Sequence, residues 1–295
     1  MRISTKKAAT ALAGAAAFCS LHHSPCLGHT SFVRPLDPRH CSAIKRALPY
    51  PRSNRNHVLK LAAGGPPRPV GESTPLSRAR DVLFGPAFRS LLPPMAAAGA
   101  LLGPNLDNYH SAFGVLTYKH PIELTVAGHL IVTTDWWVPP LFAVAGAGIG
   151  ALYILLDAAL ETPQAQREPV WRDVLLSISL FSFQYYLSGL LTAVGCPYWV
   201  LVGSLAVIAE RVFDVFDATR AGLWVSLATA TLGPLIEVFL VNTTDLYVYN
   251  GADFFGVDSW IPIVYFCGGP AVGNLARTIY AKILSAERKE GRNLT

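Results

Sequence analysis

Ionisable side chains are rare in the apolar part of this chain, so each one that interrupts an apolar run is a candidate for chemistry. Charges are costly in an apolar medium and are therefore found there in ion pairs, proton relays or ligand sites. Glu237 is the clearest case, because it lies inside a long apolar run and must face the protein interior or a cavity, either ionised or protonated and hydrogen-bonded. The others are Glu210, Asp217, Arg220 and Arg277.

Asp214, Asp217 and Arg220 follow one another at intervals of three residues. On one face of a helix end, this spacing brings an acid and a base close enough to pair. The spacing therefore allows an ion pair between Asp217 and Arg220 that would fix the adjoining loop.

Three histidines, His110, His120 and His129, fall in the segment 103–135. A metal site needs converging ligands, and this spacing does not place three histidines on one helical face. No serine–histidine–aspartate order, phosphate-binding loop or zinc-protease motif occurs in the apolar part of the sequence. We therefore predict no metal and no cofactor, and we favour a non-enzymatic protein over an enzyme.

The composition is that of a membrane protein. Hydrophobic residues make up 52% of the 295 and charged residues 15%, and the mean hydropathy is +0.36, which is too apolar for an ordinary soluble domain of this size. The formal charge of +5 is unevenly distributed, because residues 1–71 carry eleven lysines and arginines and one acid. The basic character therefore belongs to the N-terminal segment, and it indicates targeting rather than nucleic-acid binding.

Composition also divides the chain into four parts. Residues 1–63 are poor in acids and rich in Ala, Ser, Arg and Pro, which is typical of a transit peptide, or of a signal peptide followed by one. This favours a plastid membrane, and the alternative is a disordered basic tail on a protein of the endoplasmic reticulum membrane. Residues 64–80 read as a Pro/Gly linker, 81–284 as a six-span membrane domain and 285–295 as a polar tail.

The apolar runs predict an all-α membrane protein, a bundle of six transmembrane helices. The expected spans cover residues 82–102, 137–156, 174–195, 197–213, 223–241 and 260–284. Arginines and lysines gather in the loops of one side, which places both termini on the cytosolic or stromal side. Between the first two spans, residues 103–135 are expected to form a long loop with one short re-entrant or interfacial piece near 113–118.

Packing signals lie within these spans. Trp136 and Trp137 precede Pro139, a pattern typical of a helix that enters a bilayer through its interface. Small residues recur one helical turn apart, which allows neighbouring helices to approach closely. These pairs are Gly146 with Gly150 and Gly269 with Gly273. Gly268-Gly269-Pro270 is expected to break its helix, because proline lacks a backbone N–H donor.

Four stretches carry a further pattern. They are Trp136-Trp137-Val138-Pro139-Pro140 leading to Leu152-Tyr153 and Asp157; Phe216-Asp217-Ala218-Thr219-Arg220-Ala221-Gly222; Val248-Tyr249-Asn250-Gly251; and Ser259-Trp260-Ile261-Pro262 continuing to Gly268-Gly269 and Gly273-Asn274-Leu275-Ala276-Arg277. In their order and spacing, these stretches resemble the Insig family of endoplasmic reticulum proteins, which bind oxysterol and retain or mark sterol-regulated partners.

The resemblance implies a membrane regulator or scaffold that binds a sterol or other isoprenoid lipid and docks a membrane-protein partner. It implies partner binding at Asp217, with Arg220 beside it, and a purely structural salt bridge is the alternative there. The residues implied in lipid binding or bundle packing are Trp136, Trp137, Pro139, Gly146, Gly150, Tyr249, Trp260, Gly269, Gly273 and Asn274.

The sequence also departs from the family pattern in its third span, at Pro93-Pro94, and at Glu237 and Asp253. A second hypothesis therefore stays open. It is a plastid membrane carrier, or an enzyme acting on a lipid or pigment, that uses the same fold with Glu237, Asp217 or the histidines as working groups.

Overall fold

The computed structural model describes residues 74–293, which belong to the unit Arg68–Thr295. The predicted targeting segment at 1–63 lies outside the described residues, as do residues 64–73 of the predicted linker. The rest of that linker is not extended, because it begins the helix α3 (Pro75–Leu83). Thr74 caps this helix by accepting a hydrogen bond from the Ser77 N–H at 3.2 Å.

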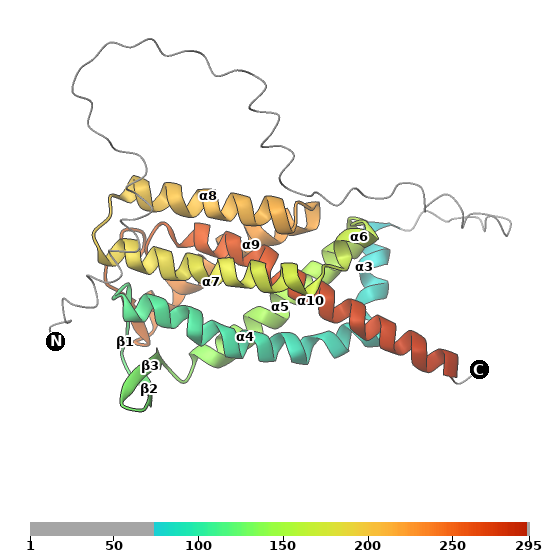
Figure 1. Cartoon of the computed structure of the whole chain (residues 1–295), viewed down its shortest axis with the longest axis horizontal. Coiled ribbons are helices and arrows are strands. Elements are labelled where there is room, and N and C mark those ends of the chain that lie inside the picture. Colours follow the sequence, from blue (N-terminus) through green and yellow to red (C-terminus); the bar gives the residue numbers. More distant parts are fainter. Residues whose placement is uncertain (1–73, 294–295) are drawn as a thin grey trace, which may run out of the picture. The chain divides into compact units, whose positions relative to one another are not determined.

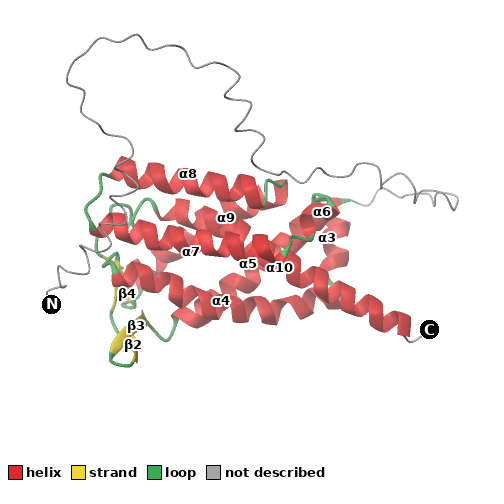
Figure 2. Cartoon of the chain, viewed as in Figure 1, coloured by secondary structure: helices red, strands yellow, loops and turns green. Residues whose placement is uncertain are grey.

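Six long helices build the described part of the chain (Figures 1 and 2). They are α4 (Pro86–Ala112), α5 (Val138–Ala159), α7 (Trp171–Ala193), α8 (Tyr198–Phe216), α9 (Arg220–Thr243) and α10 (Ile261–Asn293). A four-residue helix, α6 (Gln164–Arg167), precedes α7. The six-helix membrane bundle predicted from the apolar runs is therefore confirmed. The last helix continues to Asn293, past the end that the sequence predicted for the membrane domain.

Successive long helices run in opposite directions, so their connections gather at two ends of the bundle (Figure 1). Helices α3 and α6 and the corner at 217–219 lie at one end, which we call the α3 end. All four β-strands and the α7–α8 turn lie at the other, which we call the hairpin end. Each connection, short or long, therefore joins two helices at the same end of the bundle.

The first long helix is longer than predicted. The sequence indicated a loop from residue 103, but α4 continues to Ala112 and contains Pro93, Pro94 and Pro104. A proline removes one backbone donor without ending a helix whose neighbours still pack against it. Its last turns carry Asp107, Asn108 and His110, whose polarity resembles that of a loop, yet Asp107 and His110 are buried against the bundle.

Two short antiparallel ribbons, which the sequence did not predict, complete the hairpin end. Strand β1 (Leu116–Tyr118) pairs with β4 (Tyr247–Tyr249), with Leu116 opposite Tyr249. Strand β2 (Ile122–Val126) pairs with β3 (His129–Thr134) through a tight turn at Ala127 and Gly128, both with positive φ. The segment 113–118, predicted to hold a short re-entrant or interfacial piece, contains strand β1, which bonds to a strand from a distant loop.

Helix α10 passes through Pro270 without a break, which corrects the prediction of a break at Gly268-Gly269-Pro270. Only one intrahelical donor is lost at a proline. The flanking turns are held by close packing, because α10 contacts every other long helix of the bundle.

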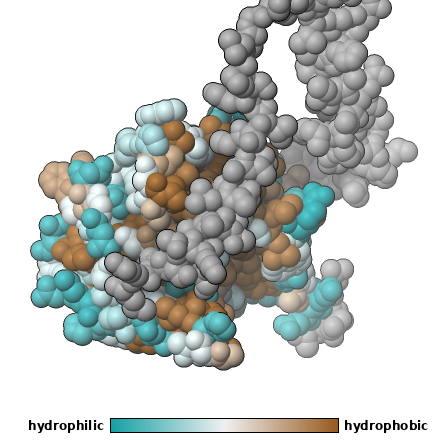
Figure 3. Space-filling view, turned by 60° about the vertical axis from the view of Figure 1, so that its left-hand side comes forward, coloured by the Kyte–Doolittle hydropathy of each residue, from teal (hydrophilic) through white to brown (hydrophobic). Residues whose placement is uncertain are grey.

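Large hydrophobic side chains are exposed on the outer faces of the long helices, among them Leu101, Val144 and Phe239, and Figure 3 shows hydrophobic patches beside hydrophilic ones on one face of the molecule. By length and composition, α5, α7 and α9 are suited to cross a membrane, and only 17% of the most apolar window of α9 is buried. A soluble protein rarely leaves such a surface in water. These exposed side chains are instead suited to contact lipid, so the chain is an integral membrane protein.

Candidate functional site

A buried ion cluster lies inside the bundle toward the α3 end. The Arg277 guanidinium donates Nε to Asp157 Oδ2 and Nη2 to Asp157 Oδ1, both at 2.7 Å. It also donates Nη1 to Asp217 Oδ1 and Nη2 to Thr219 Oγ1, both at 3.0 Å. The Tyr153 ring lies 4.9 Å from the guanidinium carbon, and its hydroxyl donates to Asp217 Oδ2. We call these five residues the ion cluster.

Helix ends place the acids of the ion cluster. Asp157 lies in the last turn of α5, and Asp217 follows the last residue of α8. Ala218 then takes a left-handed backbone (φ 52°), which lets Thr219 cap α9 by accepting from the Gly222 N–H at 2.9 Å. A Cβ on Gly222 would lie 1.9 Å from Asp217 Oδ2, so only glycine fits this corner.

The structure corrects the predicted pair between Asp217 and Arg220. Asp217 is buried and pairs with Arg277, whereas Arg220 is exposed and no ion pair joins it to an acid among residues 74–293. The three-residue spacing failed because α8 ends before Asp217 and α9 begins at Arg220, so the two residues do not share a helical face. Asp214 is likewise exposed.

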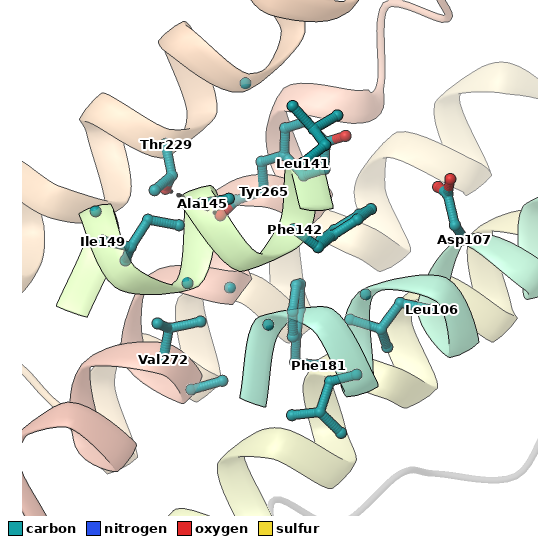
Figure 4. A pocket seen from close by; sticks show the side chains of 18 of the residues that line it. Leu106, Asp107, Leu141, Phe142, Ala145, Ile149, Phe181, Thr229, Tyr265 and Val272 are labelled. Carbon is teal, nitrogen blue, oxygen red and sulfur yellow. Dashed lines mark hydrogen bonds between the residues drawn. The ribbon is translucent and has the colours of Figure 1, made fainter. Parts of the chain in front are cut away.

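A pocket of about 430 Å³ opens between α4, α5, α7, α9 and α10. Figure 4 shows side chains from these helices directed into it, with Ile149 and Val272 toward one side and Asp107 toward the other. Most of the lining is apolar, and we call the apolar part of the lining the shaft. The shaft includes Met95, Leu102, Ile149, Leu152, Val272 and Leu275.

The end of the pocket nearest β4 is polar. Glu237 accepts hydrogen bonds from the hydroxyls of Tyr249 and Tyr265, and Asp107 Oδ2 accepts from Tyr118 Oη at 2.6 Å. The Trp137 ring stacks on Tyr247 with 5.2 Å between centroids, and its buried Nε1 has no partner among the described residues. We call this set the acid end. Its members are Asp107, Tyr118, Trp137, Glu237, Tyr249 and Tyr265.

Burial also changes the acidity of groups in the connections at the hairpin end. It raises the pKa values of Tyr118 and Tyr247, whose ionised forms would also face the Asp107 carboxyl. Burial, aided by the nearby Asp253 carboxyl, raises the pKa of Asp258 from 3.8 to about 6. The tyrosines are therefore hydroxyl donors at neutral pH.

The predicted glycines lie where helices approach closely. A Cβ on Gly146 would meet the Met95 carbonyl oxygen at 2.6 Å, and one on Gly150 would meet the Met95 side chain at 3.0 Å. On α10, a Cβ on Gly269 would lie 2.1 Å from Ser226 Oγ, and one on Gly273 would lie 2.2 Å from the Tyr153 ring. These positions join α4 to α5, and α10 to α9 and α5.

The remaining predicted residues are spread over the bundle. Trp136 is exposed and Pro139 is half-buried in the first turn of α5. Trp260 is buried edge-on to His110, with 5.4 Å between centroids. Asn274 donates to the Phe216 carbonyl at 2.8 Å, which ties α10 to the end of α8.

The histidines do not converge. His110 is buried in α4, where it bonds to Ser188 Oγ at 2.9 Å, whereas His120 and His129 are exposed around the β2–β3 ribbon. No group of three or more metal-ligating side chains occurs within residues 74–293.

Sequence reasoning missed Asp107 and Tyr265 at the pocket, Tyr118 beside Asp107, and Asp157 in the ion cluster. Asp107 was assigned to a loop, and nothing in the tyrosine positions indicated convergence on Glu237. Asp157 offered a signal, because it is an acid within the last turn of an apolar helix.

Comparison with known proteins gives one consistent result. No family model matches the chain. It is 33% identical over 149 residues to the insulin-induced gene 1 protein of Xenopus tropicalis, an alignment that covers 50% of this chain and 58% of that protein. The human protein of the same name is also 33% identical over 149 residues, with 52% of its length covered. The chain thus spans about half the length of the curated relatives it matches.

A solved structure shares the fold. It is that of a mycobacterial Insig homolog from Mycobacterium vanbaalenii, with a TM-score of 0.53 and 20% identity. The match covers 64% of this chain and 94% of that chain. At this identity the likeness supports the fold alone.

Proposed function

This chain is a divergent relative of the Insig proteins, and from that relationship we propose that it is a non-enzymatic membrane regulator or scaffold. It binds a sterol or another isoprenoid lipid inside its bundle and docks a second membrane protein. The observation that carries the proposal is the pocket of about 430 Å³, whose apolar shaft ends at a small set of polar groups. Pockets of this size and lining bind small amphipathic molecules.

The proposed partner contact excludes Asp217 itself. Its side chain is enclosed by Arg277, Tyr153 and Thr219, so it cannot also contact a second protein without opening the ion cluster. Arg220 and Asp214 are exposed at the same corner and are the accessible groups there.

The plastid compartment proposed from residues 1–63 is a separate question, and locating a tagged full-length chain tests it.

Lipid binding is tested by photo-crosslinking the full-length chain with a diazirine-bearing cholesterol analogue in detergent. The variant Ala145→Phe fills the pocket from α5, and Val144→Phe places the same ring on the exposed face of the neighbouring residue. We expect labelling that excess cholesterol competes away in the parent and in Val144→Phe, and that falls about tenfold in Ala145→Phe.

Equal labelling of both variants would show that the probe binds the outer surface rather than the pocket. The thermal stability of each variant is measured in parallel, so that loss of labelling by unfolding is recognised. Absence of competable labelling of the parent would overturn the proposal.

A further inference from the structure

The ribbon of strands β2 and β3 exposes apolar side chains along its length. Every residue of β2 is exposed, and so are the first three residues of β3. Five large hydrophobic side chains among them are 50% to 57% exposed, namely Ile122, Leu124, Val126, Leu130 and Ile131. The ribbon of β1 and β4 instead buries alternate residues. The β2–β3 ribbon is therefore an apolar surface that the chain leaves uncovered, and such a surface marks contact with another molecule or with a membrane.

The two faces of this ribbon differ. Side chains alternate between faces along a strand, and residues paired directly across two strands share a face. We call one face the apolar face, and its members are Ile122, Leu124, Val126 and Val132, with His129 opposite Val126 at the turn. The opposite face carries Glu123, Thr125 and Thr133, with Leu130 opposite Thr125.

The ribbon is fixed beside the end of α4. The Asn108 side-chain amide donates to the Ile131 carbonyl at 3.2 Å, and its side-chain oxygen accepts from the Thr133 N–H at 2.7 Å. These bonds occupy the outer edge of β3 and leave β2, which is exposed throughout, as the free edge. Figure 1 shows the ribbon projecting from the hairpin end beyond α4.

The ribbon continues a surface that already contacts lipid. Leu101 is 70% exposed on α4 and lies two helical turns before Asn108, on the same face of the helix. On the other side of the ribbon, β3 leads within two residues to Trp136, which is 69% exposed and precedes α5. Exposed tryptophans are favoured at the boundary between hydrocarbon and water.

We propose that the apolar face of the β2–β3 ribbon lies on the phospholipid bilayer, at the head-group level of the leaflet nearest the hairpin end. The free edge of β2 sets this depth, because unpaired backbone N–H and C=O groups are excluded from the hydrocarbon core but are satisfied among head groups and water. The ribbon is then an interfacial anchor in addition to the membrane-spanning helices. A second copy of the chain, paired along the same edge, is the competing occupant.

The test places a photoreactive diazirine amino acid at single positions of the full-length chain, reconstituted in phosphatidylcholine vesicles. The probe replaces Leu124 on the apolar face, Thr125 on the opposite face, or Val144, which is 72% exposed on α5. Mass spectrometry identifies the product after illumination. We expect phospholipid adducts from the probes at Leu124 and Val144, and about tenfold fewer from the probe at Thr125, because adjacent strand residues point to opposite faces.

The product at Leu124 distinguishes the occupants. A crosslink to a second copy would overturn the proposal and make the apolar face an interface between copies. Absence of a phospholipid adduct there, while the Val144 probe gives one, would place the ribbon in water. Equal adducts from Leu124 and Thr125 would show that the ribbon is not oriented by its apolar face, which also overturns the proposal.

Paired variants test whether the apolar face causes the contact. With the probe at Leu124, the double variant Ile122→Gln and Val126→Gln should reduce the phospholipid adduct about tenfold. The matched change on the opposite face, Glu123→Gln and Thr125→Gln, should keep it. All four side chains are exposed, so neither double variant disturbs the packing of the bundle. An unchanged adduct in the Ile122→Gln and Val126→Gln protein would mean that the helices alone bring the ribbon to the lipid, and would overturn its role as an anchor.

Discussion

At the α3 end, Arg277 forms four hydrogen bonds to Asp157, Asp217 and Thr219, whereas at the hairpin end the Trp137 Nε1 and Asp258 Oδ2 atoms have no partner among the described residues. Both regions bury acids in a membrane protein. At the α3 end, the Arg277 guanidinium supplies both the positive charge and the hydrogen bonds that the acids need. At the hairpin end, tyrosine hydroxyls donate hydrogen bonds to Glu237 and Asp107, and no cation of the described residues is paired with these acids.

This difference separates a structural site from a binding site. A buried ion set that is fully hydrogen-bonded holds its helices in one arrangement and leaves no group for a ligand. The ion cluster joins α5, the α8–α9 corner and α10 in this way. The acid end borders open volume and keeps unused hydrogen-bonding capacity, which is what recognition of a polar group requires.

The largest predicted effect breaks the ion cluster. Arg277→Leu leaves Asp157 and Asp217 buried without their cation, and we expect it to lower the free energy of unfolding by about 3–5 kcal/mol. Arg220→Leu removes an exposed arginine from the same corner and should change it by at most about 0.5 kcal/mol. Unfolding of both variants in detergent gives the comparison.

A stable Arg277→Leu protein would contradict the structural role. If Arg220→Leu were destabilised instead, the result would support the ion pair between Asp217 and Arg220 that the sequence suggested. If Arg220 contacts the docked partner, Arg220→Leu should stay folded and no longer co-purify with that partner. Loss of the partner from Arg277→Leu would not be informative, because that variant is expected to be destabilised.

The helices could be predicted because a bilayer sets both the length and the composition of a span. The end of α4 could not, because Asp107, Asn108 and His110 are polar whether they lie in a loop or face a protein interior. Three residues at local spacing suggested the wrong partner for Asp217. The actual partner, Arg277, lies 60 residues away, and only the packing of α10 against α5 and the α8–α9 corner brings them together.

Glu237 shows the same limit at the pocket. Its position in an apolar helix indicated a partnered acid facing the interior, but its donors come from β4 and α10, and no local pattern identifies either tyrosine. The short ribbons also carry too few residues for a clear alternating pattern. At both sites, therefore, the sequence does not predict which side chains pair when they lie far apart along the chain.

A smaller effect tests the close helix contacts at glycine that position the pocket. Gly146→Ala places a methyl group 2.6 Å from the Met95 carbonyl oxygen and should destabilise the bundle by about 1–3 kcal/mol. Gly148→Ala, two residues along α5, meets nothing within 4 Å and should be neutral or stabilising by up to about 1 kcal/mol, because alanine favours a helix. Thermal unfolding should therefore show a loss of stability in Gly146→Ala and none in Gly148→Ala. Equal shifts in the two variants would show that α4 and α5 do not approach as closely as this.

The smallest predicted effect is a pH dependence at the hairpin end. Asp258 has one carboxyl oxygen without a partner, and its folded-state pKa of about 6 is above the ordinary value of 3.8. Below about pH 4 the carboxyl is protonated in both the folded and unfolded states, so it has no effect on stability. Between about pH 4 and 6 the unfolded chain ionises first, and this residue lowers the stability of the fold. The full shift would correspond to about 3 kcal/mol, and solvent screening of this incompletely buried carboxyl reduces the expected loss to about 1–2 kcal/mol.

The asparagine side chain of Asp258→Asn is uncharged at every pH and should remove that loss. The stability of the variant relative to the parent should therefore increase as the pH rises from 4 to 6 and stay constant above pH 6. The measurement is thermal unfolding in detergent across this range, with Asp214→Asn on the exposed side of α8 as the control. A pH profile of Asp258→Asn that parallels the parent would mean that solvent or a counter-ion reaches Asp258, and that the hairpin end is less sealed from water than its burial indicates.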